Sequence, residues 1–244
     1  LPELVRLEDI RGNLHAHTRA SDGQYSLEDM AEAARELGYE YLAVTDHTKN
    51  MAMTKGLDEK RLREQMEEID KLNEKLDGFR VLKGSEVDIL EDGSLDLDDS
   101  ALKELDVVVC SIHTKFDLSS EKQTNRILRA MDNPCMHILG HPTGRLINQR
   151  DAYDVNIERI IDAAADRGCH LELNAQPDRL DLTDVHCRLA KETGVMIAVS
   201  TDAHSTSELQ FMKYGIHQAR RGWLEADDVI NTRSWSELQK LLQR

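Results

Sequence analysis

Residues 26–46, SLEDMAEAARELGYEYLAVTD, contain one complete helix–glycine–strand unit. Ser26 and Asp29 are an N-cap pair, and Gly38 can adopt the left-handed conformation that ends a helix. The run 41–46 that follows is apolar enough for a buried strand. Between the cap and the glycine, apolar residues recur at helical spacing, which predicts one buried helix face: Leu27, Met30, Ala34 and Leu37.

The same order of helix, glycine and strand recurs along the chain. The repeats are helix 58–76 with Gly78 and strand 80–89, helix 156–167 with Gly168 and strand 169–175, and helix 183–192 with Gly194 and strand 195–203. Strands are also expected at 12–16, 106–112 and 137–140, with a helix near 120–131 and a closing amphipathic helix at the C-terminus. Seven continuous apolar strands predict a parallel sheet covered by helices. A closed βα barrel would bring the carboxyl ends of these strands to one face, where active sites lie.

Length and composition fit one soluble domain spanning residues 1–244. No apolar stretch reaches the roughly 18–20 residues needed to cross a bilayer, so no membrane partner is expected. Four cysteines without CxxC spacing favour reduced thiols in a cytoplasmic protein. A net charge of −15 argues against a protein that coats nucleic acid, although bound divalent cations would cancel part of that charge.

Six of the ten histidines stand where an apolar run ends, and three acidic residues join them. Residues two apart in a strand point the same way, so paired ligands such as those in HAH and DAH aim at one point. Imidazole and carboxylate without cysteine suit Zn, Mn, Fe or Co. The candidates are too many for one ion, which predicts two or three metals with Glu86 as the bridging carboxylate. The nine are His15, His17, Asp22, His47, Glu86, His113, His141, Asp202 and His204.

The motifs HAHTRASDG, VTDH, KGSEVDIL, SIHTKF, GHPTGR and STDAH resemble the PHP (polymerase and histidinol phosphatase) domain over nearly the whole chain. GHPTGRL, LELNAQPDRLDL and ARRGWLEADDVINT are most similar to the C-terminal PHP domain of bacterial family X DNA polymerases. LEDIRGNLH resembles the junction with the polymerase portion. We therefore expect residues 1–11 to be a residual linker and the chain, which lacks an initiator Met, to be a domain cut from a longer protein.

This resemblance implies a distorted (β/α)7 barrel of the PHP type with a trinuclear metal site at the C-terminal ends of the strands. The ions expected are three divalent metals, Mn²⁺ or Zn²⁺, with Fe²⁺ or Co²⁺ as alternatives. Carried over by motif, one metal is held by His15, His17, Glu86 and Asp202, a second shares Glu86 and adds His113 and His141, and a third is held by Asp22, His47 and His204.

Clustered divalent ions activate water and stabilise the phosphoryl group, so no side-chain nucleophile is needed. The resemblance implies a metal-dependent phosphoric ester hydrolase that uses such water, most simply a 3′–5′ exonuclease that processes DNA 3′ ends. Candidate catalytic residues are Glu86, Asp202 and His204, with the proton carrier left open. Candidate phosphate contacts are Arg145 after GHP, Arg179 after NAQP, and Asn174 at a strand end, whereas Arg19 is interpreted as surface charge.

Other functions fit parts of the pattern. A histidinol-phosphatase-like enzyme acting on small phosphomonoesters would use the same metals. A non-catalytic, metal-bound structural domain of a DNA polymerase would retain the ligands for stability. An amidohydrolase-type deaminase also begins with HxH, but the additional histidines fit it less well. For the exonuclease, the partners expected are DNA 3′ ends, bound weakly by the isolated domain, and a covalently attached family X polymerase portion that grips the DNA.

Overall fold

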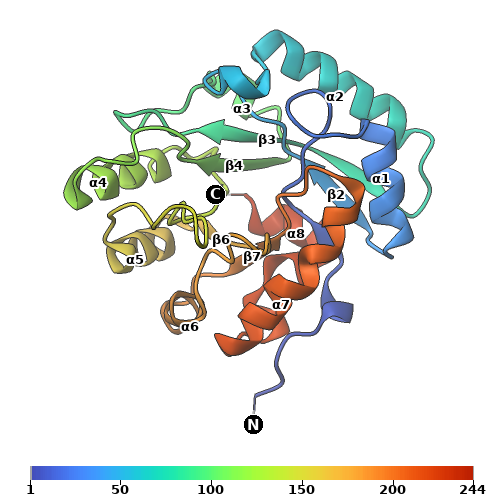
Figure 1. Cartoon of the computed structure of the whole chain (residues 1–244). Helices are drawn as coiled ribbons and strands as arrows, with labels where there is room; N and C mark the ends of the chain where they lie inside the picture. Colours follow the sequence, from blue (N-terminus) through green and yellow to red (C-terminus); the bar gives the residue numbers. More distant parts are fainter. Residues whose placement is uncertain (1, 244) are drawn as a thin grey trace.

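The computed structural model describes residues 2–243, and in it seven parallel strands alternate with helices around one barrel (Figure 1). The strands are neighbours in sequence order, from β1 to β7. They are β1 Gly12–Asn13, β2 Tyr41–Val44, β3 Arg80–Asp88, β4 Val107–Ser111, β5 Ile138–Leu139, β6 His170–Asn174 and β7 Ile197–Ser200. The predicted (β/α)7 fold is confirmed.

Helices connect the strands and cover the outside of the sheet (Figure 1). The α-helices are α1 Leu27–Glu36, α2 Glu59–Asn73, α3 Asp99–Leu102, α4 Ser120–Met131, α5 Ile157–Arg167, α6 Asp184–Thr193, α7 Met212–Arg221 and α8 Trp235–Leu241. Short 3-10 helices are η1 Leu7–Asp9, η2 Ala52–Thr54, η3 Thr206–Phe211, η4 Ala226–Asp228 and η5 Ile230–Thr232. No helix in the described part of the chain is long and apolar enough to cross a membrane.

The predicted repeat of helix, glycine and strand is present in the structure. The glycines after α1, α2, α5 and α6 all have left-handed φ, between 65° and 84°: Gly38, Gly78, Gly168 and Gly194. Ser26 accepts a hydrogen bond from the backbone of Asp29, which completes the predicted cap of α1. Several boundaries differ by a few residues: α2 ends at Asn73 rather than at 76, β7 is Ile197–Ser200 rather than 195–203, and β1 is only two residues long. After β1 the chain leaves the ladder, and Ala16 bridges instead to Ala203, beyond the end of β7.

β3 is the longest strand because it pairs with two neighbours in succession. Arg80–Lys83 pair with β2, and Gly84–Asp88 pair with β4. At the change of partner, a Cβ on Gly84 would lie 2.8 Å from the carbonyl oxygen of Val44, so only glycine permits this close approach. Glu86 lies in the second half of β3, two residues after this change of partner, among the candidate ligands.

Side-chain amides help to close the barrel between β7 and β1. Nδ2 of Asn231 donates to the carbonyl oxygens of Gly12 and Val199, at 2.8 Å each, and its Oδ1 accepts from the backbone N–H of Val199. Asn13 similarly donates to the hydroxyl of Thr201 and accepts from its backbone N–H. These amides replace part of a backbone ladder, which explains the distortion of the barrel.

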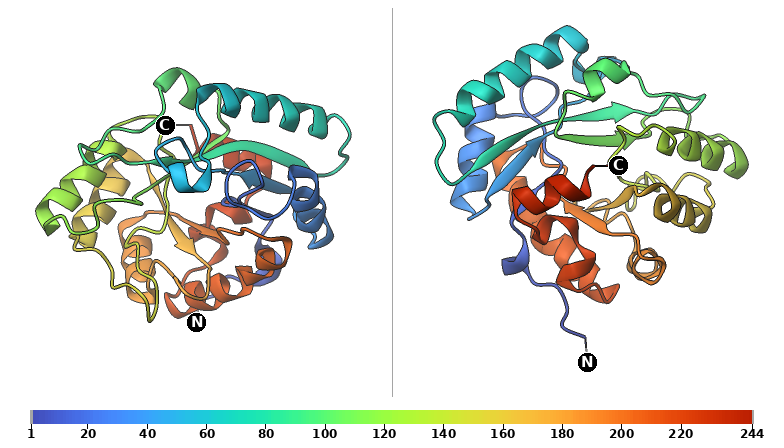
Figure 2. Two further views of the ribbon diagram at one scale, coloured as in Figure 1. Left: turned by 45° about the horizontal axis from the view of Figure 1, so that its top comes forward. Right: turned by 180° about the vertical axis from the view of Figure 1, so that it is seen from behind.

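The barrel interior is filled from the end opposite the candidate ligands. Apolar side chains of the strands, including Leu14, Tyr41 and Leu82, form one buried cluster with Leu238 and Leu242 from the C-terminal segment. Seen from behind, α8 lies across the barrel at this end (Figure 2). The predicted closing helix is therefore confirmed, and the carboxyl ends of the strands remain available for polar side chains.

Candidate metal centre

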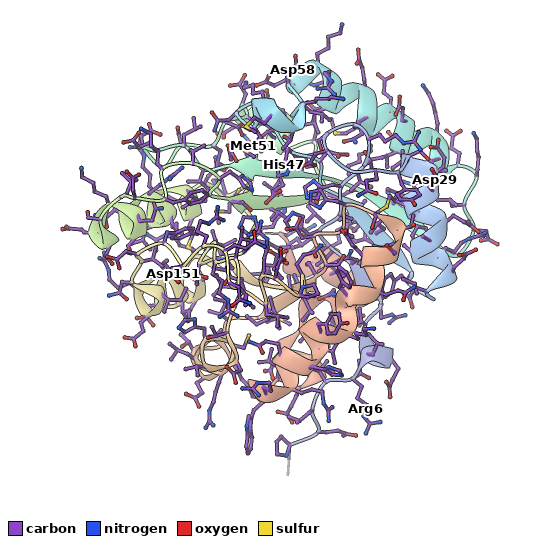
Figure 3. The ribbon with its side chains drawn as sticks, viewed as in Figure 1. Arg6, Asp29, His47, Met51, Asp58 and Asp151 are labelled. Carbon is purple, nitrogen blue, oxygen red and sulfur yellow. The ribbon has the colours of Figure 1, made fainter. Side chains whose placement is uncertain are left out.

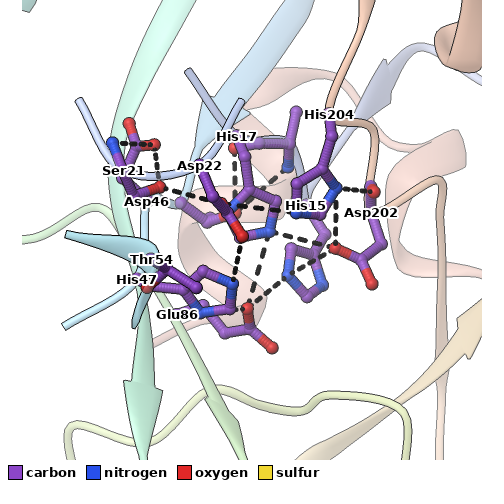
Figure 4. Close-up of polar contacts among 12 residues, drawn as sticks. His15, His17, Ser21, Asp22, Asp46, His47, Thr54, Glu86, Asp202 and His204 are labelled. Atoms are coloured by element: carbon purple, nitrogen blue, oxygen red, sulfur yellow. Dashed lines mark hydrogen bonds and ion pairs between the residues drawn. The ribbon is translucent and has the colours of Figure 1, made fainter. Parts of the chain in front are cut away.

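All nine candidate ligands come from the carboxyl-terminal halves of strands or from the loops that follow them. Glu86 is the only one inside a strand, β3. The others follow their strands: His15, His17 and Asp22 after β1, His47 after β2, His113 after β4, His141 after β5, and Asp202 and His204 after β7. The close-up shows Glu86 of β3 and side chains from the loops after β1, β2 and β7 converging on one point (Figure 4). The view with all side chains places His47 near the middle of the same face (Figure 3).

Glu86 lies at the middle of the cluster and is 1% exposed. Each of its carboxylate oxygens faces several imidazole nitrogens. Oε2 lies 3.3 Å from Nε2 of His15, 3.5 Å from Nε2 of His17 and 3.0 Å from Nδ1 of His47. Oε1 lies 3.2 Å from Nε2 of His113 and 2.9 Å from Nε2 of His141. One carboxylate facing five imidazoles has the position expected of a bridging ligand.

The possible ligand atoms form three overlapping groups, each within 4.8 Å. They are His15, His17, Glu86 and Asp202; His17, Asp22, His47 and His204; and His47, Glu86 and His113. The first matches the set expected for one metal, and the second contains the set expected for the third metal. In the last group His47 stands where His141 was expected, while His141 contacts the same oxygen of Glu86 as His113 does. The structure therefore brings the nine residues together, and their division among ions stays a prediction.

The donor set fits divalent cations. Among the described residues, Nε2 of His15, Nδ1 of His17 and Nδ1 of His47 are buried and make no hydrogen bond. Buried polar atoms normally have a partner, so three such nitrogens facing carboxylates fit residues that would hold a cation. Imidazole nitrogens and carboxylate oxygens without thiolate are the ligands of Zn²⁺, Mn²⁺ and Fe²⁺ sites.

Electrostatics keep the carboxylates ready to bind cations. Burial alone would raise the pKa of Glu86, but the imidazoles of His15 and His113 hold it well below its usual range. The pKa of Asp202 is also held low against burial, mainly by His15 and His17. Both carboxyl groups are therefore ionised at neutral pH, which is the state that a metal requires.

Two buried carboxylates behind the cluster were not identified from the sequence. Glu172 contacts His15, with Oε1 2.7 Å from Nδ1, and its other oxygen accepts from the backbone N–H of His141 at 2.6 Å. Asp88 contacts Nδ1 of His113. Such partners fix the orientation and tautomer of ligating histidines. Strand periodicity is the signal for Asp88, two residues after Glu86, and Glu172 is a charged residue in an otherwise apolar strand.

Asp46 organises the loop that carries Asp22. Its oxygens accept from the backbone N–H and hydroxyl of Thr18, at 2.8 and 2.6 Å, and from the hydroxyl of Ser21 at 2.5 Å. Nε2 of Gln65 on α2 donates to it as well, at 2.6 Å. Because Thr18, Ser21 and Gln65 donate to both of its oxygens, Asp46 acts as a buried anchor for the β1 loop.

The three predicted phosphate contacts differ in which protein atoms their N–H donors already face. Nδ2 of Asn174 donates to Oδ2 of Asp202 at 3.1 Å, and Nε of Arg179 lies 3.5 Å from the same oxygen. Nε of Arg145 donates instead to the carbonyl oxygen of Arg179 at 2.7 Å, and its Nη2 donates to that of Leu180. Arg145 thus shapes the loop that presents Arg179, and a phosphate contact of its own stays a prediction, as do those of Arg179 and Asn174.

Arg19 fits its interpretation as a surface side chain. Its Nε donates to the carbonyl oxygen of Gln24 at 3.0 Å, and its Nη2 lies 3.7 Å from Asp29. The side chain is 63% exposed. It nevertheless lies on the β1 loop, three residues from Asp22.

The chain belongs to the PHP domain family, whose model matches residues 13–176. It is 44% identical over 242 residues to "DNA polymerase/3′-5′ exonuclease PolX" of Bacillus subtilis, which covers 99% of this chain and 42% of that protein. It is 32% identical over 229 residues to a protein named as a probable phosphatase of Thermoanaerobacter sp., with 89% of each chain covered. The chain thus spans less than half the length of the first relative and most of the second.

Solved structures show the same fold at low sequence identity. The HisK protein of Listeria monocytogenes matches with a TM-score of 0.65 at 17% identity, over 81% of this chain and 97% of that one. Histidinol phosphate phosphatase of Lactococcus lactis, solved with zinc, L-histidinol and phosphate, matches with a TM-score of 0.59 at 17% identity, over 86% and 93%. These matches agree with the PHP-type barrel that the motif resemblance implies.

Proposed function

We propose that this chain is a metal-dependent phosphoesterase that removes nucleotides from DNA 3′ ends as a 3′–5′ exonuclease. The observation that carries this proposal is the convergence of eight imidazole and carboxylate side chains with Glu86. These residues would hold three divalent ions, Mn²⁺ or Zn²⁺. When bound, such ions supply Lewis acidity to the phosphoryl group and lower the pKa of a water molecule.

Asp202 links the proposed metal-binding and substrate-binding sides. Its Oδ1 lies 3.0 Å from Nε2 of His17, whereas its Oδ2 faces Asn174 and Arg179. Among the described residues, Nη1 of Arg179 is buried and has no hydrogen-bond partner. This unpaired donor beside Asp202 supports a role for Arg179 in holding a phosphate oxygen, because guanidinium groups bind phosphates through several N–H donors.

The proposed centre is open on one side. Asp22 and His204 have side chains 28% and 29% exposed, whereas those of His15, His17 and Glu86 are at most 1% exposed. A substrate would therefore approach past Asp22 and His204 and meet the buried residues with its phosphate. Of the candidate catalytic residues, Glu86 would hold the ions together, and Asp202 would contact an ion through Oδ1 and face the substrate side through Oδ2. His204, at the exposed edge, is placed to exchange a proton with solvent.

DNA as substrate is supported by the identity to PolX over 99% of this chain. The net charge of −15 predicts weak affinity for a polyanion, so we propose that a covalently attached polymerase portion provides most of the DNA grip. The second candidate function is hydrolysis of a small phosphomonoester. It is favoured by the 32% identity, over most of both chains, to the probable phosphatase of Thermoanaerobacter.

The test is an assay of the purified chain with Mn²⁺ on single-stranded DNA labelled at its 5′ end, beside p-nitrophenyl phosphate. Stepwise shortening that is lost in Asp202→Asn supports the exonuclease. Turnover of p-nitrophenyl phosphate alone supports the phosphomonoesterase. Turnover of neither substrate, by a folded and metal-loaded chain, contradicts catalysis and leaves a structural, metal-bound domain.

A further inference from the structure

A pocket of about 330 Å³ lies between the loops after β1 and β2. This volume is at the lower end of the range for small-ligand sites. One wall comes from the β1 loop and the other from the segment around η2. The lining includes Arg19, Ser21, Asp22, Met53, Thr54 and Lys55, and we call it the Lys55 pocket.

The Lys55 pocket adjoins the candidate metal centre through Asp22. The Oδ1 and Oδ2 atoms of Asp22 lie 3.4 Å from Nε2 of His204 and 3.5 Å from Nε2 of His47, so one side of this carboxylate belongs to the cluster. The residue also lines the pocket. Figure 4 shows Thr54, from the opposite wall, on the same side of the centre as Asp22 and His47. A phosphoester at the centre would therefore have the rest of the substrate at the entrance to this pocket.

Both walls of the Lys55 pocket are fixed to each other. Nη1 of Arg61, on α2, donates to the carbonyl oxygens of Lys55 and Gly56 at 2.6 and 3.1 Å, and its Nη2 donates to that of Ala20 at 2.7 Å. A Cβ on Gly56 would lie 1.9 Å from the carbonyl oxygen of Thr48, so the β2 loop closes tightly on itself. The pocket is thus built by specific contacts and is not a chance gap between loops.

The chemistry of the Lys55 pocket suits a nucleotide. Arg19 and Lys55 place two cations beside it in a chain of net charge −15. Met53 is 98% exposed, which leaves a large apolar, polarisable side chain facing solvent at the rim. Thioethers make favourable contacts with aromatic rings. Cations that follow a phosphate backbone, combined with side chains that contact base faces, are the usual features of single-strand binding sites.

We propose that the Lys55 pocket binds the nucleotide next to the scissile phosphate. Lys55 and Arg19 hold the neighbouring phosphate, and Met53 packs against the base. The inference rests on the proposed function, because the pocket is placed relative to a phosphoester at the metal centre. A small phosphomonoester has no second phosphate, so it would bind at the metal centre and Arg179 without using the Lys55 pocket.

The test compares Lys55→Met with Lys60→Met, a matched control on α2 whose side chain is 83% exposed and 3.7 Å from Glu64. Binding of a fluorescent single-stranded oligonucleotide is followed by anisotropy at several salt concentrations. Specificity is the ratio of kcat/KM on the oligonucleotide to that on p-nitrophenyl phosphate. Loss of one phosphate contact should weaken binding about fivefold to tenfold and reduce the slope of log K against log salt by about one in Lys55→Met only. The specificity ratio should fall by a similar factor.

Met53→Ala separates the base contact from the charge. It should weaken binding of an ordinary oligonucleotide and leave that of one with abasic 3′-terminal residues unchanged. Equal effects of Lys55→Met and Lys60→Met, or no effect of Lys55→Met and Met53→Ala, would overturn the proposal. Because anisotropy needs no turnover, weaker binding by Lys55→Met in a chain that hydrolyses neither substrate would support the pocket while contradicting the exonuclease.

Discussion

Nδ1 of His15 lies 2.7 Å from Oε1 of Glu172, and both side chains are fully buried. The same carboxylate accepts from the backbone N–H of His141 through its second oxygen. Glu172 therefore orients one candidate ligand and fixes the loop of another. Its Oε2 also accepts from Nδ2 of Asn174 at 3.2 Å, so Glu172 acts as a positioning residue for the metal centre.

Glu172→Gln should weaken metal binding. The amide cannot accept at both ends, so either the imidazole of His15 or the N–H of His141 loses its acceptor. Changes of this kind usually cost about 10–100-fold in metal affinity. Competition with a chromophoric chelator measures the affinity, and Glu158→Gln, at an exposed position of α5, is the control. Equal affinities of Glu172→Gln and wild type would show that Glu172 does not position the ligands.

Arg126 should prove important for stability although it lies on a covering helix. It is 2% exposed and donates to the carbonyl oxygens of Ile89, Leu90 and Thr114, which belong to the loops after β3 and β4. Arg126→Gln leaves the carbonyl oxygen of Ile89 without a donor in a buried bond and removes two half-buried bonds, to Leu90 and Thr114. Loss of the donor to a buried group costs about 1–3 kcal/mol. Urea unfolding should show that cost for Arg126→Gln and almost none for the exposed Arg129→Gln on the same helix. A destabilisation no larger than that of the control would refute this role.

Asp181 should make stability depend on pH. Burial raises its pKa to about 6, although hydrogen bonds from Thr143 and the charge of Arg145 oppose the shift. Because an unfolded aspartic acid has a pKa of about 3.9, the folded state keeps a proton between about pH 4 and pH 6 that the unfolded chain releases. Ionisation of Asp181 therefore lowers the free energy of unfolding as pH rises through that window. The loss reaches its full size above the window.

Asp181→Asn should remove this pH-dependent loss of stability, because an amide does not ionise. Its oxygen can still accept from the N–H groups of Thr143 and Gly144, which donate to Asp181 at 2.9 Å in the wild type. Relative to wild type, the variant should gain about 2 kcal/mol in unfolding free energy between pH 4.5 and pH 7.5. Urea unfolding at both pH values measures the difference, with Asp178→Asn, at an exposed position, as control. A difference between variant and wild type that does not change with pH would count against the raised pKa.

The sequence predicted the elements that repeat and missed those that depend on one contact. Residues 26–46 contain an N-cap, an apolar stripe, a left-handed glycine and a buried strand, and the structure shows each. α7 was not predicted, because Gly215 stands inside it and weakens the helical pattern. That glycine permits close packing, since a Cβ there would lie 2.6 Å from Cγ1 of Val199. The amides of Asn231 and Asn13 act only across the barrel seam, which no local pattern reveals.

The sequence likewise predicted some features of the candidate metal centre and missed others. The histidines at strand ends could be found because the carboxyl ends of parallel strands share one face. The sharing of His47 between two possible ion positions could not be found from the sequence, because it depends on distances between side chains from different strands. The place of Arg145 after a ligand motif suggested a phosphate contact, which stays a prediction; the sequence did not show that its Nε and Nη2 donate to the carbonyl oxygens of Arg179 and Leu180.

Metal content tests the central claim most directly. The purified chain is saturated with Mn²⁺ or Zn²⁺, desalted, and measured by mass spectrometry, beside Glu86→Ala. With nine ligands shared through one bridging carboxylate, wild type should retain about three ions per chain and Glu86→Ala at most about one. Retention of less than one ion by wild type, with the same melting temperature before and after chelation, would contradict a metal centre at this face of the barrel.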